Sequence, residues 1–109
     1  MITVEQYFMG RDKEYAGDCT DLITANAHYT VEAVNTLLAI AKKDGIEPGI
    51  DQVTGNHVSS GWRSPTVNDR TCNAAKGSAH LSGEACDLQD HKDRRLARWC
   101  LRNLNELDK

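Results

Sequence analysis

Residues 31–45 have the sequence VEAVNTLLAIAKKDG. Its apolar residues recur every three or four positions, which is the spacing of one face of an α-helix. This stripe consists of Val31, Val34, Leu37, Leu38 and Ala41. Two lysines suit the negative end of the helix dipole, and Gly45 can form a left-handed cap. We predict a helix from about Thr20 to Asp44, with an internal break at Asn26 or Thr30 before its strongest part.

Weaker patterns on the C-terminal side of this helix predict two strands. Residues 52–60 alternate in part, and residues 84–88 place Ala85 and Asp87 on one face and Cys86 and Leu88 on the other. Between them, residues 68–77 are polar and small, which is typical of a loop or a short helix. Helices around a small antiparallel sheet predict the α+β class.

The two ends of the chain complete the predicted fold. Residues 1–15 have no clean period, so we predict an irregular segment that Val4, Tyr7 and Phe8 attach to the core. A last helix is predicted at residues 91–107 with Asp90 as its N-cap. Its apolar side consists of Leu96, Trp99, Cys100, Leu104 and Leu107.

Size and composition limit the classes of protein that fit. The chain has 109 residues, so we expect a single domain over residues 1–109 that acts as a monomer. It has 13 Lys and Arg against 16 Asp and Glu, and this net charge of −3 argues against a nucleic-acid partner. The longest apolar run, residues 37–41, is far too short for a membrane span. Residues 1–6 lack the basic and apolar regions of a signal peptide, which favours a cytoplasmic location.

Four cysteines are scattered along the chain, at positions 19, 72, 86 and 100. They permit two disulfides in any of three connectivities. Free thiols are the better interpretation for a chain without an export signal. A four-cysteine zinc site is disfavoured because structural zinc usually has closely paired ligands.

The chemistry-bearing stretch is SAHLSGEACD, residues 78–87. It places His80 and Asp87 on either side of Gly83, whose flexible backbone can bend to bring both side chains together. Imidazole nitrogen and carboxylate oxygen are both good zinc ligands. On this spacing alone, a surface histidine and a hydrogen-bonded carboxylate remain the commoner interpretation.

A second stretch of sequence favours a metal site over these ordinary roles for His80 and Asp87. SGWRSP at residues 60–65, then Asn68, then the Ser-x-His-x-x-Gly-x-Ala-x-Asp pattern of residues 78–87 closely resemble the M15 family of zinc D,D-peptidases. This family contains D-Ala-D-Ala carboxypeptidases and dipeptidases, and bacteriophage endolysins that cut peptidoglycan stem peptides. The resemblance implies a Hedgehog/D,D-peptidase-like fold, Zn²⁺ as cofactor and peptidoglycan peptides as substrate.

The resemblance also implies roles for individual residues. His80 and Asp87 match two of the three zinc ligands of the family. Arg63 matches the arginine that contacts the substrate and stabilises negative charge on the attacked carbonyl. Ser78 matches a position near the substrate. A phage or bacterial enzyme of this kind would stay in the cytoplasm until its release to the cell wall.

The sequence departs from the family pattern at its end. The family has a third ligand, a histidine, and a catalytic glutamate further on, and no Glu-x-x-His segment follows residue 87 here. His57 and His91 are weak substitutes, since neither occupies the family position. We therefore expect either a C-terminally truncated peptidase without its catalytic strand, or an inactive peptidoglycan-binding or structural module of the same fold. A third hypothesis is that the chain is an intracellular protein in which His80 and Asp87 are ordinary polar residues.

Several neighbouring residues have simpler interpretations. Trp62 and Trp99 are expected to pack in the core. His28 is expected to face solvent. Glu84 lies opposite Asp87 in the strand alternation, so we expect it to be either an exposed carboxylate or one that contacts the ligand residues without binding the metal. The charged run at residues 92–95 is typical of a solvated helix face.

Overall fold

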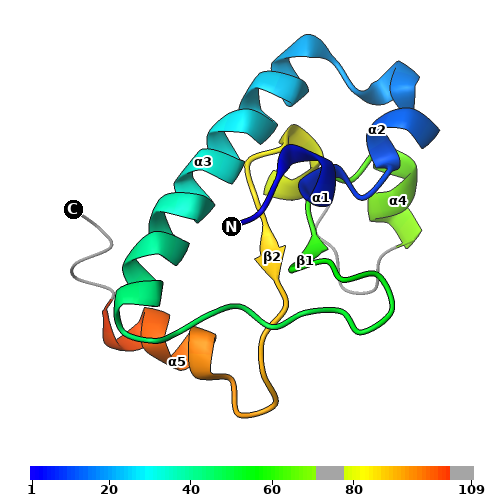
Figure 1. The fold of residues 1–109 in the computed structure, drawn as a ribbon. Helices are drawn as coiled ribbons and strands as arrows, with labels where there is room; N and C mark the ends of the chain where they lie inside the picture. The colour runs from blue at the N-terminus through cyan, green and yellow to red at the C-terminus, as the bar shows by residue number, and fades with distance from the viewer. Residues whose placement is uncertain (71–77, 104–109) are drawn as a thin grey trace.

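The computed structural model describes residues 1–70 and 78–103 of the chain (Figure 1). Seven helical segments, including two short 3₁₀ helices written η, accompany two short strands in the described part. In chain order they are α1 (Val4–Phe8), α2 (Arg11–Glu14), η1 (Ala16–Asp18), α3 (Asp21–Lys43), β1 (Val58–Ser60), α4 (Pro65–Arg70), η2 (Ala79–Ser82), β2 (Asp87–Leu88) and α5 (Arg95–Arg102). Helices around a small antiparallel sheet confirm the α+β prediction.

The long helix α3 is the axis of the molecule (Figure 1). It begins after Thr20, whose hydroxyl accepts a hydrogen bond from the Ile23 N–H. It ends in front of Gly45, whose positive φ of 74° provides the predicted left-handed cap. The predicted break at Asn26 or Thr30 is wrong, because the helix is continuous through both residues.

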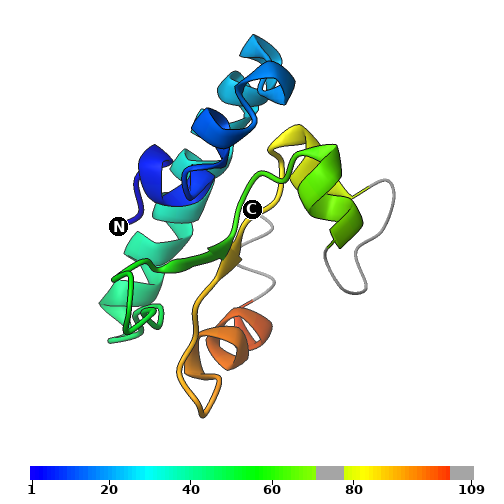
Figure 2. The same cartoon turned by 90° about the vertical axis from the view of Figure 1, so that its right-hand side faces the viewer.

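The N-terminal segment is more regular than predicted, since it forms α1, α2 and η1. Thr3 and Gln6 form a reciprocal capping box at the start of α1, which is a signal that the sequence pattern contains. Tyr7 and Phe8 are buried as expected. They hold α1 against α3 and β1 (Figure 2).

Both strands are shorter than predicted. β1 starts at Val58 because residues 51–56 close a turn, in which the Asp51 carboxylate accepts the N–H groups of Val53 and Thr54. β2 starts at Asp87. Two residues earlier, the Ala85 carbonyl accepts a hydrogen bond from the Tyr7 hydroxyl at 2.8 Å. This carbonyl is therefore bonded to a side chain and not to the backbone of β1.

The two strands pair antiparallel, and Ser60 lies opposite Asp87 in the register. Val58 lies opposite Leu88, so the register contains one irregularity between these pairs. The sheet therefore brings the first residue of β2 next to the end of β1, where the SGWRSP stretch begins.

Helix α5 starts four residues later than the predicted helix. Residues 91–94 form a turn that ends in a positive φ of 57° at Arg94. Asp90 is therefore not the N-cap residue, yet its carboxylate accepts the N–H groups of Leu96 and Ala97 at 3.0 Å each. It satisfies the free N–H groups of the first turn from outside the helix. Leu104 and Leu107 lie outside the described residues.

We expect Asp90→Ala to destabilise the protein by about 1 kcal/mol at neutral pH, as for other helix caps. Burial by itself raises the pKa of Asp90, but donation from the Ala97, Leu96 and His91 N–H groups outweighs it and leaves this pKa below its usual value. The stabilisation is therefore complete above the usual pKa near 4 and is lost as pH falls through the lowered pKa. Urea unfolding at neutral pH and near pH 2 measures it. Equal losses in wild type and variant on acidification would contradict this assignment.

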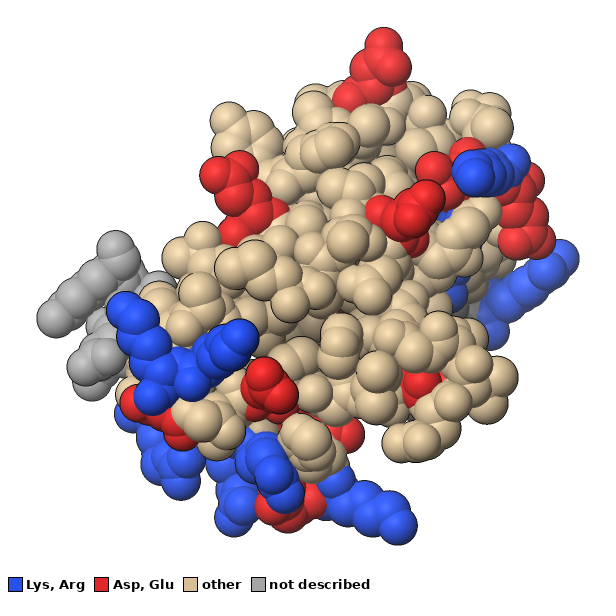
Figure 3. Space-filling view, viewed as in Figure 1, with Lys and Arg blue, Asp and Glu red and all other residues tan. Residues whose placement is uncertain are grey.

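The core lies between α1, the inner face of α3, the sheet and α5. Its buried apolar residues include Ile2, Tyr7, Phe8, Ala27, Val31, Leu38, Val58, Trp62 and Leu96. Trp62 and Trp99 are buried as predicted. Lys and Arg gather at the end of the molecule formed by the C-terminus of α3 and by α5 (Figure 3). Among the described residues, no helix is both long and apolar enough to cross a membrane.

Candidate functional site

The candidate site is built around His80, which lies in η2 and is only 8% exposed. Ser78 caps η2, because its hydroxyl accepts the His80 N–H at 3.2 Å. The imidazole Nδ1 lies 2.7 Å from the carbonyl oxygen of Gly61. A carbonyl oxygen can only accept, so the proton resides on Nδ1 and Nε2 is the nitrogen that faces the site.

Asp87 lies opposite that nitrogen. Its Oδ2 is 3.2 Å from His80 Nε2, and its side chain is 57% exposed. Between them the chain turns at Gly83, which has a positive φ of 80° that side chains other than glycine rarely adopt. The structure thus brings together the two residues that the spacing of residues 78–87 selects.

Arg63 completes the group. Its Nη2 lies 3.8 Å from Asp87 Oδ2, its Nε donates to the Ser60 hydroxyl at 3.1 Å, and its Nη1 donates to the Asn68 side-chain oxygen at 3.4 Å. Its backbone N–H donates to the His80 carbonyl at 3.0 Å. The side chain is only 11% exposed, so the guanidinium is fixed in place beside the His80–Asp87 pair.

The donor set of this pair suits a metal ion. A neutral imidazole with its proton on Nδ1 presents a lone pair on Nε2, and the carboxylate oxygen opposite presents another. Two lone pairs at 3.2 Å repel each other unless a proton or a cation lies between them. Ligand atoms about 2.0–2.1 Å from a tetrahedral zinc ion are about 3.3 Å apart, so the observed separation fits two of its ligands.

The backbone carbonyl behind His80 supports the same interpretation. Metal-binding histidines usually donate their other ring N–H to a carbonyl or a carboxylate, which fixes the tautomer and the ring orientation. Gly61 provides that acceptor here. The residues present therefore fit zinc as two of its protein ligands.

Among the residues that the structure describes, no third ligand accompanies this pair. His57 Nδ1 lies 2.8 Å from the Gly49 carbonyl, and His91 Nε2 lies 3.0 Å from the Glu47 carbonyl, so both rings are engaged elsewhere. Within residues 1–70 and 78–103, no group of three His, Cys, Asp or Glu side chains could hold a metal ion. Glu84 is exposed, as expected.

The thiol of Cys86, next to Asp87 in the chain, is partly buried. Burial, together with the adjacent Asp87 charge, raises the pKa of Cys86 to about 11. Cys86 is therefore a protonated and unreactive thiol at neutral pH when no metal is bound. Cys19, Cys86 and Cys100 are free, and Cys72 lies outside the described residues.

Three contacts that position the site were not predicted from the sequence. The Tyr7 hydroxyl bonds to the Ala85 carbonyl, and burial raises its pKa well above the usual value, with a further contribution from Cys86. The Asn26 amide donates to the Ser82 carbonyl at 3.0 Å, and the Thr30 hydroxyl donates to the Gly83 carbonyl at 2.6 Å. The two α3 side chains hold the turn that follows His80. Asn26 and Thr30 are polar residues beside the apolar stripe of α3, and this position is a sequence signal that could have identified their two contacts.

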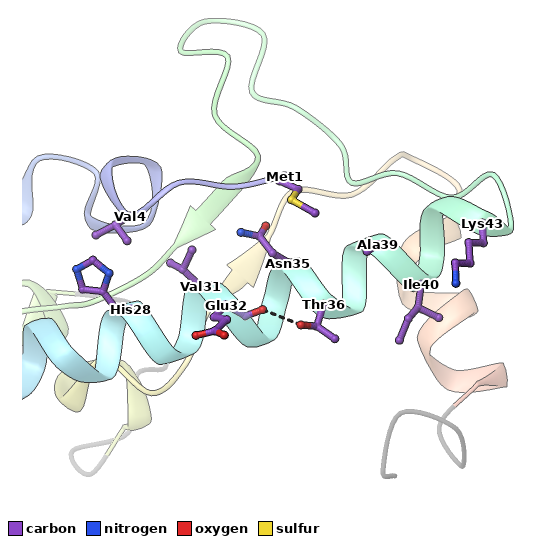
Figure 4. Close-up of a pocket in the computed structure, with 10 residues that line it drawn as sticks. All are labelled: Met1, Val4, His28, Val31, Glu32, Asn35, Thr36, Ala39, Ile40 and Lys43. Carbon is purple, nitrogen blue, oxygen red and sulfur yellow. Dashed lines mark hydrogen bonds between the residues drawn. The ribbon is translucent and has the colours of Figure 1, made fainter.

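Surface hollows lie on either side of α3. One, of about 600 Å³, runs between α3 and the N-terminal segment (Figure 4). It combines apolar side chains with His28, Glu32 and Lys43, and it contains no residue of the His80 site. His28 is exposed there, as predicted. Another, of about 630 Å³, includes Ser78 and Leu81 and therefore borders the segment that carries His80.

Comparison of the chain with family models, with curated proteins and with solved structures gave no match. The geometry of the His80 site and the sequence motifs around it are therefore the basis for assigning a function.

Proposed function

We propose that this protein is a zinc peptidase of the D,D-peptidase type, with a Hedgehog/D,D-peptidase-like fold, that hydrolyses peptide bonds of peptidoglycan stem peptides. One observation carries the proposal. His80, held through Nδ1 by the Gly61 carbonyl, directs Nε2 at Asp87 Oδ2 at 3.2 Å, and Arg63 lies beside them. The sequence motifs around these three residues resemble the same family.

His80, Asp87 and Arg63 would have separate roles in catalysis. His80 and Asp87 would hold the zinc ion. When bound, zinc lowers the pKa of a water molecule and polarises the attacked carbonyl. Arg63 would donate N–H bonds to the negative charge that develops on the carbonyl oxygen. Its bonds to Ser60 and Asn68 fix the guanidinium before the substrate arrives, so little reorganisation is needed during the reaction.

Two parts of the mechanism lie outside the described residues. A catalytic zinc site usually has three protein ligands, and peptide hydrolysis needs a general base. The proposal assigns both to residues outside 1–70 and 78–103, in this chain or in a polypeptide of which it is part. Loss of the general base alone lowers such rates by about 10²–10⁴-fold.

The decisive experiment incubates the full-length gene product with peptidoglycan stem peptides ending in D-Ala-D-Ala, and follows the products by mass spectrometry. We expect cleavage that is lost on treatment with a metal chelator and restored by added zinc. Stem peptides left intact by zinc-loaded protein would exclude the peptidase.

The absence of a third metal-binding side chain among the described residues favours a second candidate. In it, the protein is a catalytically inactive module that binds peptidoglycan through the same face. This module would sediment with purified sacculi without releasing peptides from them. A protein that neither sediments with sacculi nor cuts their peptides would fit neither candidate.

A further inference from the structure

The segment between His80 and Asp87 is held in place by side chains from other parts of the fold. The Ser82 and Gly83 carbonyls accept hydrogen bonds from α3, and the Ala85 carbonyl accepts one from α1. The donors are, in the same order, Asn26, Thr30 and Tyr7. β2 begins only at Asp87, so the three carbonyls lie before the sheet. The path of the chain between the two residues of the pair is therefore fixed by α1 and α3.

Thr30 forms the shortest of these three contacts. Its hydroxyl donates to the Gly83 carbonyl at 2.6 Å, and Gly83 is buried. Gly83 lies directly against α3, because a Cβ on it would be 3.0 Å from the Ile23 carbonyl oxygen and 3.4 Å from the Ala27 nitrogen. A buried carbonyl that loses its partner is unfavourable, so removal of the hydroxyl favours movement of the turn away from α3 and towards water.

Tyr7 holds the segment at its other end. Its hydroxyl donates to the Ala85 carbonyl at 2.8 Å, two residues before Asp87. The side chain is fully buried, and its ring packs edge-on against Phe8, so the hydroxyl has little freedom to move. The position at which the chain enters β2 therefore depends on a residue of α1.

The separation of the His80–Asp87 pair determines how well it can hold a metal ion. Nε2 and Oδ2 are 3.2 Å apart, close to the separation of about 3.3 Å between two ligands of a tetrahedral zinc ion. The Asp87 side chain is 57% exposed, so packing holds it only in part. Its placement depends on the backbone that leads to it. Residues that orient a metal ligand typically contribute about 10–100-fold to metal affinity.

We propose that Tyr7 and Thr30 are positioning residues, which set the separation between His80 and Asp87 and thereby the zinc affinity of the site. That the pair holds zinc rests on the proposed function, whereas its separation is a property of the chain alone. Asn26 supports the same turn through the Ser82 carbonyl, at 3.0 Å. Each of these side chains acts through a backbone carbonyl, and each lies outside the two sequence motifs.

Thr30→Val and Tyr7→Phe test the proposal, because each removes a hydroxyl and keeps the approximate shape of the side chain. We expect each to lower the zinc affinity of the full chain by about tenfold, at the lower end of the range for such residues. Competition titration against a chelating dye measures this change. Thr30→Ser keeps the hydroxyl and should bind zinc like wild type. Thr30 is only half-buried, so the Val and Ser variants suffice for the test if Tyr7→Phe does not fold.

Thr36→Val and Tyr15→Phe are the matched controls. Thr36 is also on α3, but its hydroxyl donates to the Glu32 carbonyl of the same helix at 3.0 Å. Tyr15 is partly buried against the same core as Tyr7, and no hydrogen bond joins it to residues 78–87. Each control removes the same group as its counterpart without releasing the segment between the pair, so both should bind zinc like wild type.

A measurement on the zinc-free chain separates this inference from the proposed function. In wild type, the ring protons of His80 should show nuclear Overhauser effects to the β-protons of Asp87, because the two side chains approach to 3.2 Å. We expect these effects to weaken in Thr30→Val and in Tyr7→Phe. They should persist in Thr30→Ser and in both controls.

Two results would overturn the inference. One is Overhauser effects that are absent from wild type, or that are as strong in Thr30→Val and Tyr7→Phe as in the controls. The other is a loss of zinc affinity in Thr30→Ser as large as that in Thr30→Val, because the hydroxyl would then not be the cause. If wild type binds no zinc but the Overhauser effects depend on Thr30 and Tyr7, the positioning role stands and the metal site of the proposed function does not.

Discussion

Replacing His80 by alanine is expected to lower the zinc affinity of the protein by more than about 100-fold. Loss of a residue that merely orients a ligand costs about 10–100-fold, and His80 would itself be a ligand. Its ring is held on one side by the Gly61 carbonyl at 2.7 Å and faces Asp87 on the other at 3.2 Å. Competition titration of zinc against a chelating dye, with the full-length protein, measures the change.

His57→Ala is the matched control for this experiment. The Nδ1 atom of His57 also bonds to a backbone carbonyl, that of Gly49 at 2.8 Å, but no ion-pair partner within 4 Å faces its ring among the described residues. We expect this variant to bind zinc like wild type. Equal losses in both variants would show that zinc binds histidines without using the His80–Asp87 pair, and the metal site would then be wrong.

Local patterns predicted the long helix well and the strands poorly. The bounds of α3 follow from a periodic apolar stripe and from Thr20 and Gly45 at its ends, all of which are local in sequence. Strand ends depend on competing partners for the backbone. Residues 51–56 turn on the Asp51 carboxylate, and the Ala85 carbonyl is bonded by Tyr7, which lies 78 positions away. No periodicity contains that information.

The candidate site likewise has one part that local sequence predicts and another that depends on long-range contacts. The pairing of His80 with Asp87 follows from a short segment with a glycine between them, so their spacing was sufficient to suggest it. The support behind them is not local. The Gly61 carbonyl lies 19 positions from His80, and Arg11 reaches Trp62 across 51 positions. These contacts depend on how α1, α2 and the sheet pack together, which a single sequence does not state.

Gly61 contributes both to the core packing and to the candidate site. Its carbonyl holds His80, and its α-carbon lies against the backbone of Tyr7. A Cβ at position 61 would overlap the Tyr7 carbonyl oxygen and would lie 2.9 Å from the Tyr7 carbonyl carbon. Tyr7 cannot move aside easily, because it is fully buried, belongs to α1 and is bonded through its hydroxyl to Ala85. Neither backbone segment can yield without disrupting the core.

We therefore expect Gly61→Ala to destabilise the protein by about 3 kcal/mol or more, at the upper end of the cost of overpacking. Such a loss is a large share of the about 5–15 kcal/mol by which domains are stable. Gly17→Ala is the matched control, since a Cβ there meets no atom within 4 Å, and it should change stability by less than about 0.5 kcal/mol. Urea unfolding compares the two. In Gly61→Ala the Gly61 carbonyl shifts and no longer holds the His80 ring, so zinc affinity should also fall in the fraction of the variant that remains folded. Equal stability and equal zinc affinity in the two variants would contradict the close approach of Gly61 to the Tyr7 backbone.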